Sequence, residues 1–115
     1  MEQHSENIVK TSEVINVEVK NNDREKLGKI EDIMLDKLEG AVRYVVLSFG
    51  GIMGLGDKLF ALPWKSISYE PEEQCFILNI SKERLQNAPG FNKDAWPDMA
   101  EPEWQELIKS YYNQM

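Results

Sequence analysis

The 115-residue chain has a single cysteine, Cys75, and a single histidine, His4. One cysteine excludes a disulfide within the chain, and we expect a reducing compartment, the cytoplasm. His4 stands in a polar N-terminal stretch without neighbouring ligands or nucleophiles, so the residues predict neither a zinc site nor nucleophilic catalysis. We therefore expect no catalytic residue, no cofactor and no resident metal.

Positive charge and long hydrophobic runs are also scarce. The chain has 13 Lys and Arg against 20 Asp and Glu, a net charge of −7. Nucleic-acid phosphates and anionic membrane surfaces attract basic clusters, so we expect neither as a partner. The longest apolar run is far shorter than the roughly 20 residues of a membrane-spanning helix, and the polar N-terminus lacks the pattern of a signal peptide. We expect a soluble, cytoplasmic chain.

Glycine is not abundant, but four of the seven glycines stand within residues 50–56: Gly50, Gly51, Gly54 and Gly56. The spacing of Gly51 and Gly56 matches the start of a phosphate-binding loop, in which Lys and then Ser or Thr come next. Here Asp57 and Lys58 follow, and the loop joins two strand-like runs rather than feeding a helix. We therefore interpret these glycines as turn residues that supply positive φ angles.

The same loop carries apolar side chains. Ile52, Met53 and Leu55 stand between glycines, which cannot shield them from water, and Phe49 precedes them. Exposed together, they would form the kind of apolar patch that marks an interface, and we predict a homodimer contact at these four residues. The alternative is that they fold back over the mouth of a barrel. The sequence leaves both open.

Strand patterns dominate the chain before residue 80. Val14–Val19 alternates between apolar and polar residues, and Val42–Phe49 is apolar on both faces, so both faces should be covered. Gly28 lies inside a strand-like run and indicates a bulge or a close backbone approach. The predicted strands are Val14–Val19, Leu27–Asp36, Val42–Phe49, Leu59–Leu62, Ile67–Tyr69 and Cys75–Ile80.

Helical spacing appears only near the C-terminus. Ser81 is a favourable N-cap for a short helix through Leu85, and Pro102 is a favourable first helical residue. The second helix should present an apolar stripe to the outer side of the Val42–Phe49 strand, and its predicted members are Trp104, Leu107, Ile108 and Tyr111.

The pattern predicts a mainly β domain, a small closed barrel of about six strands with a C-terminal helical tail packed on it. The expected division is a flexible tail at 1–11, the barrel at 12–80 and a helical extension at 81–115. Asp32 is expected to point inward, where Lys58 or Arg43 would neutralise it. The tryptophans are expected in core and tail-docking positions rather than as base-stacking residues, because the chain is acidic.

Five stretches of the chain resemble a known family, the PRC-barrel domain. They are Glu25–Asp32, Tyr44–Gly51, Gly54–Trp64, Ala88–Phe91 and Trp96–Met99. The last two are typical of stand-alone bacterial members, which are related to the cytoplasmic part of the photosynthetic reaction-centre H subunit. The residues that carry the resemblance most strongly are Gly28, Gly50, Gly51, Gly54, Gly56, Asp57, Lys58, Pro63 and Trp64.

The resemblance implies a β-barrel used as an adaptor, with no catalytic residues common to the family. One relative sits against a membrane complex, and another binds a ribosomal protein. We therefore predict a non-enzymatic assembly module that forms a homodimer and docks an unknown protein partner. The alternative is a stress-related sensor of a small ligand or metal ion that uses the barrel mouth or an acidic C-terminal cluster of Asp94, Asp98, Glu101 and Glu103.

Overall fold

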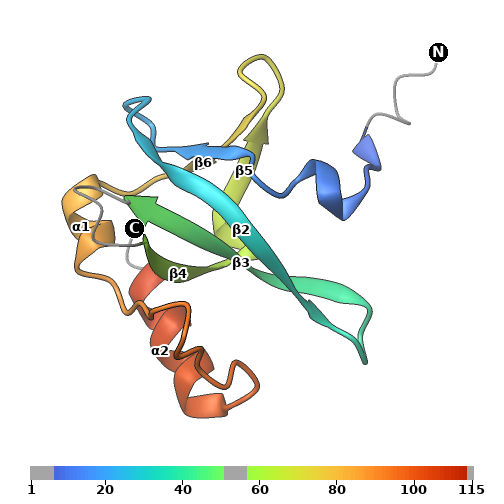
Figure 1. Cartoon of the computed structure of the whole chain (residues 1–115), viewed down its shortest axis with the longest axis vertical. Helices are drawn as coiled ribbons and strands as arrows, with labels where there is room; N and C mark the ends of the chain where they lie inside the picture. The colour runs from blue at the N-terminus through green and yellow to red at the C-terminus, as the bar shows by residue number, and fades with distance from the viewer. Residues whose placement is uncertain (1–6, 51–56, 114–115) are drawn as a thin grey trace.

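The computed structural model describes residues 7–50 and 57–113. They form one six-stranded sheet, in the order β4-β3-β2-β1-β6-β5, and two α-helices (Figure 1). The strands are β1 (Glu18–Lys20), β2 (Lys26–Asp36), β3 (Ala41–Gly50), β4 (Asp57–Pro63), β5 (Ile67–Glu70) and β6 (Cys75–Leu78). The helices are α1 (Lys82–Gln86) and α2 (Pro102–Tyr112), and two 3₁₀ turns are η2 (Thr11–Glu13) and η4 (Trp64–Ser66).

The sheet is a half-barrel, so the mainly β fold is confirmed but its closure is partial. All neighbouring strands are antiparallel except β1 and β6, and β4 and β5 are the two edges. Part of the β4 edge is occupied by the C-terminal extension, because Leu59 and Phe91 exchange two backbone hydrogen bonds of 2.8 Å. A segment that follows the sheet therefore lies where a closing strand would pair.

The centre of the sheet is covered on both faces, as the sequence predicted for β3. Val45 and Leu47 point to one face and Tyr44 and Val46 to the other, and all four are buried. Gly28 in β2 lies opposite Phe49, and a Cβ placed on it would stand 2.1 Å from the backbone oxygen of Ser48. The predicted close approach at this glycine is confirmed.

The predicted first strand is mostly wrong. Residues 14–16 form a turn after η2, and only Glu18–Lys20 is a strand. Asn16 has a φ of 72°, a left-handed conformation that asparagine tolerates better than most residues. Its N–H donates to the carbonyl of Ile30 at 2.7 Å, and the Ile30 N–H donates to the carbonyl of Val17 at 2.9 Å, so these two hydrogen bonds replace a regular ladder.

The C-terminal helices begin where the sequence predicted. The Ser81 hydroxyl accepts the Arg84 N–H at 3.1 Å and caps α1. Helix α2 packs beside β4 (Figure 1), and the Trp104 ring meets the Tyr44 ring of β3 edge to face at 5.2 Å.

The apolar stripe of α2 differs from the prediction at one position. Ile108 is 1% exposed and Tyr112 is also buried, whereas Leu107 is 51% exposed. Leu107 lies to the side of the stripe because each residue turns the helix by about 100°.

None of the helices in the two described ranges is long and apolar enough to cross a bilayer.

Candidate docking groove

Most residues of the predicted dimer contact cannot be placed. Ile52, Met53 and Leu55 lie outside the described residues, as do Gly51, Gly54 and Gly56. Phe49 is described: it is partly buried, and its ring meets Phe60 edge to face at 5.9 Å. Gly50 and Asp57 pair at the ends of β3 and β4.

Two expected charge contacts are absent from the described residues, and other contacts take their place. Asp32 is exposed and its carboxylate accepts the neighbouring Ile33 N–H at 2.8 Å, so it does not point inward. The Lys58 Nζ lies 5.2 Å from the Phe60 ring centroid and 3.5 Å from the Gln86 carbonyl oxygen. Lys58 thus bridges β4 to the end of α1.

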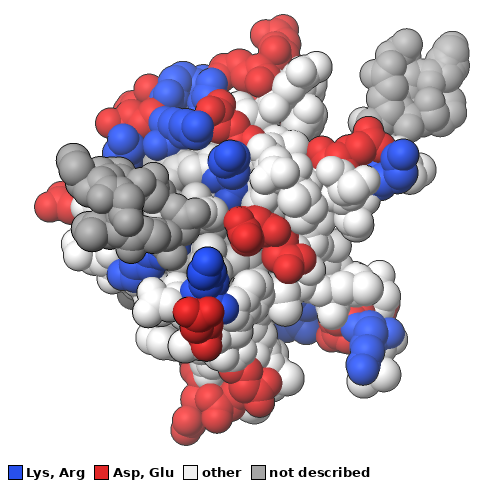
Figure 2. Space-filling model, in the orientation of Figure 1, with Lys and Arg blue, Asp and Glu red and all other residues white. Residues whose placement is uncertain are grey.

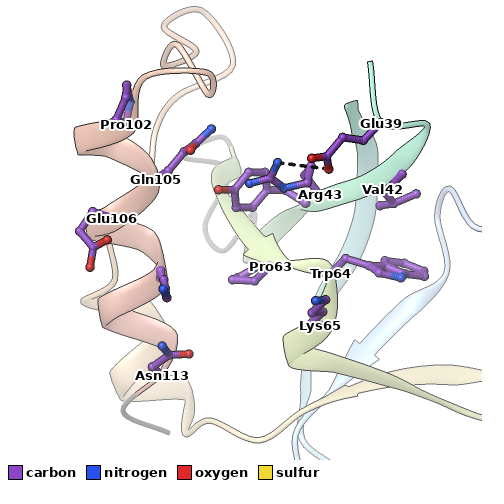
Figure 3. Close-up of a pocket in the computed structure, with 13 residues that line it drawn as sticks. Glu39, Val42, Arg43, Pro63, Trp64, Lys65, Pro102, Gln105, Glu106 and Asn113 are labelled. Atoms are coloured by element: carbon purple, nitrogen blue, oxygen red, sulfur yellow. Dashed lines mark ion pairs between the residues drawn. The ribbon is translucent and has the colours of Figure 1, made fainter. Parts of the chain in front are cut away.

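A groove of about 800 Å³ runs between α2 and the sheet (Figure 3). Pro102 and Gln105 belong to its helical wall, and Arg43 belongs to the opposite wall at the start of β3. Pro63 and Trp64 lie at the corner where β4 turns into β5. The groove thus exists only where the C-terminal extension lies beside the sheet.

Tyr44 also lines the groove, and little of its surface is exposed. Burial raises the pKa of the Tyr44 phenol, and the neighbouring Arg43 guanidinium partly counters this effect. The phenol therefore stays neutral at physiological pH and can donate a hydrogen bond. The Trp104 ring supports the Tyr44 ring from α2.

Arg43 is held by carboxylates of its own hairpin. Its Nη1 lies 3.2 Å from Asp36 and 4.0 Å from Glu39 (Figure 3 marks the Glu39 pair). The pKa of Asp36 is lowered, chiefly because the Glu39 N–H donates to its carboxylate, with smaller contributions from the Leu38 N–H and Arg43. The Arg43 charge is therefore largely compensated within the hairpin.

Two lysines of the groove have no such compensation. Lys65 at the β4–β5 corner and Lys109 on α2 both line it, and neither forms an ion pair within the described parts of the chain. Glu106 of α2 also lines the groove, and its carboxylate accepts the Ser110 hydroxyl at 3.2 Å. The charged lining residues are Arg43, Lys65 and Lys109 against Glu39 and Glu106, so the groove carries a small excess of positive charge.

Apolar surface adjoins the groove. Leu35 and Leu38, in the β2–β3 hairpin, are 61% and 93% exposed, and Val42 of the groove lies opposite Leu35. These leucines are not among the predicted interface residues, although an apolar residue such as Leu38 within a polar turn indicates a possible contact. Trp64 is 37% exposed, so the core position predicted for it is wrong.

The carboxylates of the predicted acidic cluster do not converge. No group of three His, Cys, Asp or Glu in residues 7–50 and 57–113 is placed to hold a metal ion. Asp98 instead accepts the Ala100 N–H at 3.0 Å. The interior of the half-barrel, the other place considered for a small ligand, is filled by the side chains of Phe60, Leu62 and Leu78.

A half-barrel with an open groove, rather than an enclosed cavity, is typical of a small protein-interaction module. The sequence model of the PRC-barrel domain matches residues 6–85, more than half of the chain, and the chain belongs to this family. The family is in general non-catalytic. A search of curated proteins found no match. The family match ends at Leu85 in α1, so the helical wall of the groove lies beyond it.

Proposed function

We propose that this chain is a non-enzymatic adaptor that forms a homodimer in the cytoplasm and docks a protein partner. The observation that carries the proposal is the exposure of two leucines, Leu35 and Leu38, beside an open groove. Apolar side chains gathered on a surface are often interaction sites, whereas small ligands prefer enclosed pockets. Membership in an interaction family supports the same conclusion.

The proposed dimer contact is the loop between β3 and β4, with Ile52, Met53 and Leu55 as its apolar members and Phe49 at its base. Its support is the sequence: these side chains stand among glycines that cannot cover them. The partner would then use the groove and hairpin, which lie at the other end of β3 and β4 from Gly50 and Asp57. In this proposal the barrel spans residues 12–80, and the extension from residue 81 onward adds a wall to the docking surface.

Light scattering during size-exclusion chromatography tests the dimer. We expect the whole chain to elute as a dimer at high micromolar concentration, and the double variant Ile52→Asp/Leu55→Asp to elute as a monomer. The control is Ile8→Asp/Val9→Asp, which changes two exposed apolar residues elsewhere and should stay dimeric. A monomeric wild-type chain would reject the homodimer.

Crosslinking in the native cell tests the partner. A photo-reactive residue at Leu38, in the exposed hairpin, should give one defined crosslinked protein, whereas the same group at Lys82 on α1 should not. Equal crosslinking from both positions, or none from Leu38, would reject the adaptor function.

A ligand or metal sensor has weaker support. The acidic residues near α2 do not gather in the described structure, and core side chains occupy the interior of the half-barrel. No specific observation favours this alternative over the adaptor.

A further inference from the structure

We propose that the groove between α2 and β3 binds an acidic linear segment of the partner protein, whose apolar side chain contacts Val42 and Tyr44 while its carboxylates face Lys65 and Lys109. This inference rests on the proposed function and specifies the chemistry of the partner.

The charges of the groove complement those of an acidic segment. The chain carries a net charge of −7, so an acidic segment is repelled by most of its surface. The groove reverses this balance, because Lys65 and Lys109 line it without ion pairs in the described residues. Of the two carboxylates that line the groove, Glu106 accepts the Ser110 hydroxyl and Glu39 pairs with Arg43 (Figure 3). Complementary charge of this kind directs a partner to one site and fixes its orientation.

The charges are unevenly distributed along the groove. Figure 3 shows Glu39 and Pro102 near one end and Lys65 and Asn113 near the other. The carboxylates of a bound segment would therefore lie at the Lys65 end of the groove.

Apolar surface lies between these two ends of the groove. Tyr44 and Val42 offer apolar surface in the groove, and Leu35 continues it onto the neighbouring strand because it lies opposite Val42. Arg43 and Gln105 face each other from the two walls in Figure 3 and can bind backbone groups of the segment. An apolar side chain seated between polar edges is the usual arrangement of an interaction site.

Figure 2 shows how the charged side chains are distributed over one face of the molecule. In Figure 2 acidic side chains appear over several parts of the visible face, and most basic ones lie next to them. Around β1 and the turn that follows it, Lys20 and Arg24 are paired with Glu73 and Lys26 with Glu18. Those basic residues are compensated, so they do not offer an equivalent site for an acidic segment.

Fluorescence anisotropy with defined peptide pools tests the inference on the whole chain. The probe is a pool of labelled peptides in which Asp and Glu surround Leu, Phe or Trp. One control pool has Lys and Arg in place of the acids, and a second has Ser in place of the apolar residues. We expect the acidic, apolar pool to bind and both control pools to bind at least about tenfold more weakly.

Matched charge variants locate the binding. Lys65→Glu/Lys109→Glu should weaken binding of the acidic pool by about tenfold or more. Lys82→Glu/Lys93→Glu changes the net charge equally outside the groove and should alter it by less than about twofold. Val42→Ser should weaken binding of the apolar-containing pool and leave the far-ultraviolet circular dichroism unchanged.

Four results would overturn the inference: no binding of the acidic pool, equal binding of the basic pool, equal loss in the two charge variants, or loss of the dimer in Lys65→Glu/Lys109→Glu. The last would make a second copy of this chain the occupant. If the Leu38 crosslink and the loop-dependent dimer are found while the groove variants bind normally, this inference fails and the adaptor function remains. If the Leu38 crosslink is absent, the adaptor function fails as well.

Discussion

Tyr111 and Arg84 hold each other through reciprocal contacts between α2 and α1. The Tyr111 hydroxyl donates to the Arg84 carbonyl, and the Arg84 Nη2 donates to the Tyr111 carbonyl at 3.2 Å. The guanidinium also lies 4.7 Å from the centroid of the Tyr111 ring. Arg84 belongs to the part of the chain that matches the family, and Tyr111 lies beyond it. The pair therefore attaches the extension, and with it one wall of the groove, to the domain.

Removing the Tyr111 hydroxyl tests this attachment. Tyr111→Phe keeps the ring beneath the guanidinium but loses one hydrogen bond, so we expect the free energy of unfolding to fall by about 1 kcal/mol. Urea unfolding measures it. Tyr69→Phe, at an exposed tyrosine, is the control and should change stability by less than about 0.5 kcal/mol. Equal effects would show that the Tyr111 hydroxyl contributes nothing specific.

Adjacent residues of α2 give a sharper contrast. Ile108 is 1% exposed and Leu107 is 51% exposed. Ile108→Ala leaves a cavity between α2 and the sheet and should lower the free energy of unfolding by about 2–4 kcal/mol. Leu107→Ala should change it by less than about 0.5 kcal/mol. Similar losses in the two variants would contradict the observed packing of the helix.

Gly28 and Gly40 resist substitution for different reasons. At Gly28 a side chain would collide with the neighbouring strand, whereas at Gly40 the backbone has a left-handed φ. Gly40 has a φ of 71° and open space around its Cα, so Gly40→Ala should lower the free energy of unfolding by about 1–2 kcal/mol. Gly28→Ala would place Cβ 2.1 Å from the Ser48 oxygen and force β2 away from β3. We expect a loss of about 3 kcal/mol or more. Chemical denaturation compares them, and a smaller loss at Gly28 would contradict the close strand approach.

Tyr112 makes stability depend on alkaline pH. Its hydroxyl is buried without a hydrogen-bond partner among residues 7–50 and 57–113, and burial raises the pKa of Tyr112 above its ordinary value of 10.0. The unfolded chain therefore loses this proton first as pH rises past 10.0, so the native state loses stability above that pH and not below it. Tyr112→Phe should flatten this part of the pH dependence and should cost less than about 1 kcal/mol at neutral pH.

Cys75 supplies the comparison for Tyr112. Burial also raises the pKa of the Cys75 thiol, from an ordinary value of 9.0. Cys75→Ala should therefore flatten the loss of stability that begins near pH 9.0, and leave the loss above pH 10.0 in place. Urea unfolding across this pH range measures both. An unchanged slope above pH 10.0 in Tyr112→Phe would contradict the burial of the phenol.

Local signals predicted the parts of the fold that depend on neighbouring residues. The strand β2, the apolar strand β3, the cap at Ser81 and the helix start at Pro102 are all confirmed. The first predicted strand was wrong over residues 14–16, which form a turn in which Asn16 has a left-handed φ of 72°. A period-2 pattern does not reveal such a local change of backbone conformation.

The groove could not be predicted in the same way. Its walls come from β3, the β4–β5 corner and α2, which are separated by long stretches of chain. The sequence predicted a core position for Trp64. Its side chain is instead exposed, because it lies at the corner where β4 ends and the chain turns toward β5. The sequence also offered no reason to pair Lys65 with Lys109.

The sequence alone determined the strand content, the family and the positions at which the helices begin, because these depend on side-chain periodicity, caps and glycines within a few residues. Only the tertiary structure decided that the half-barrel stays partly open, that Phe91 occupies the β4 edge, and that two lysines without ion pairs among the described residues line one groove. These features depend on contacts between segments far apart in the chain. Such contacts depend on the packing of the whole molecule and leave no periodic pattern in any one segment.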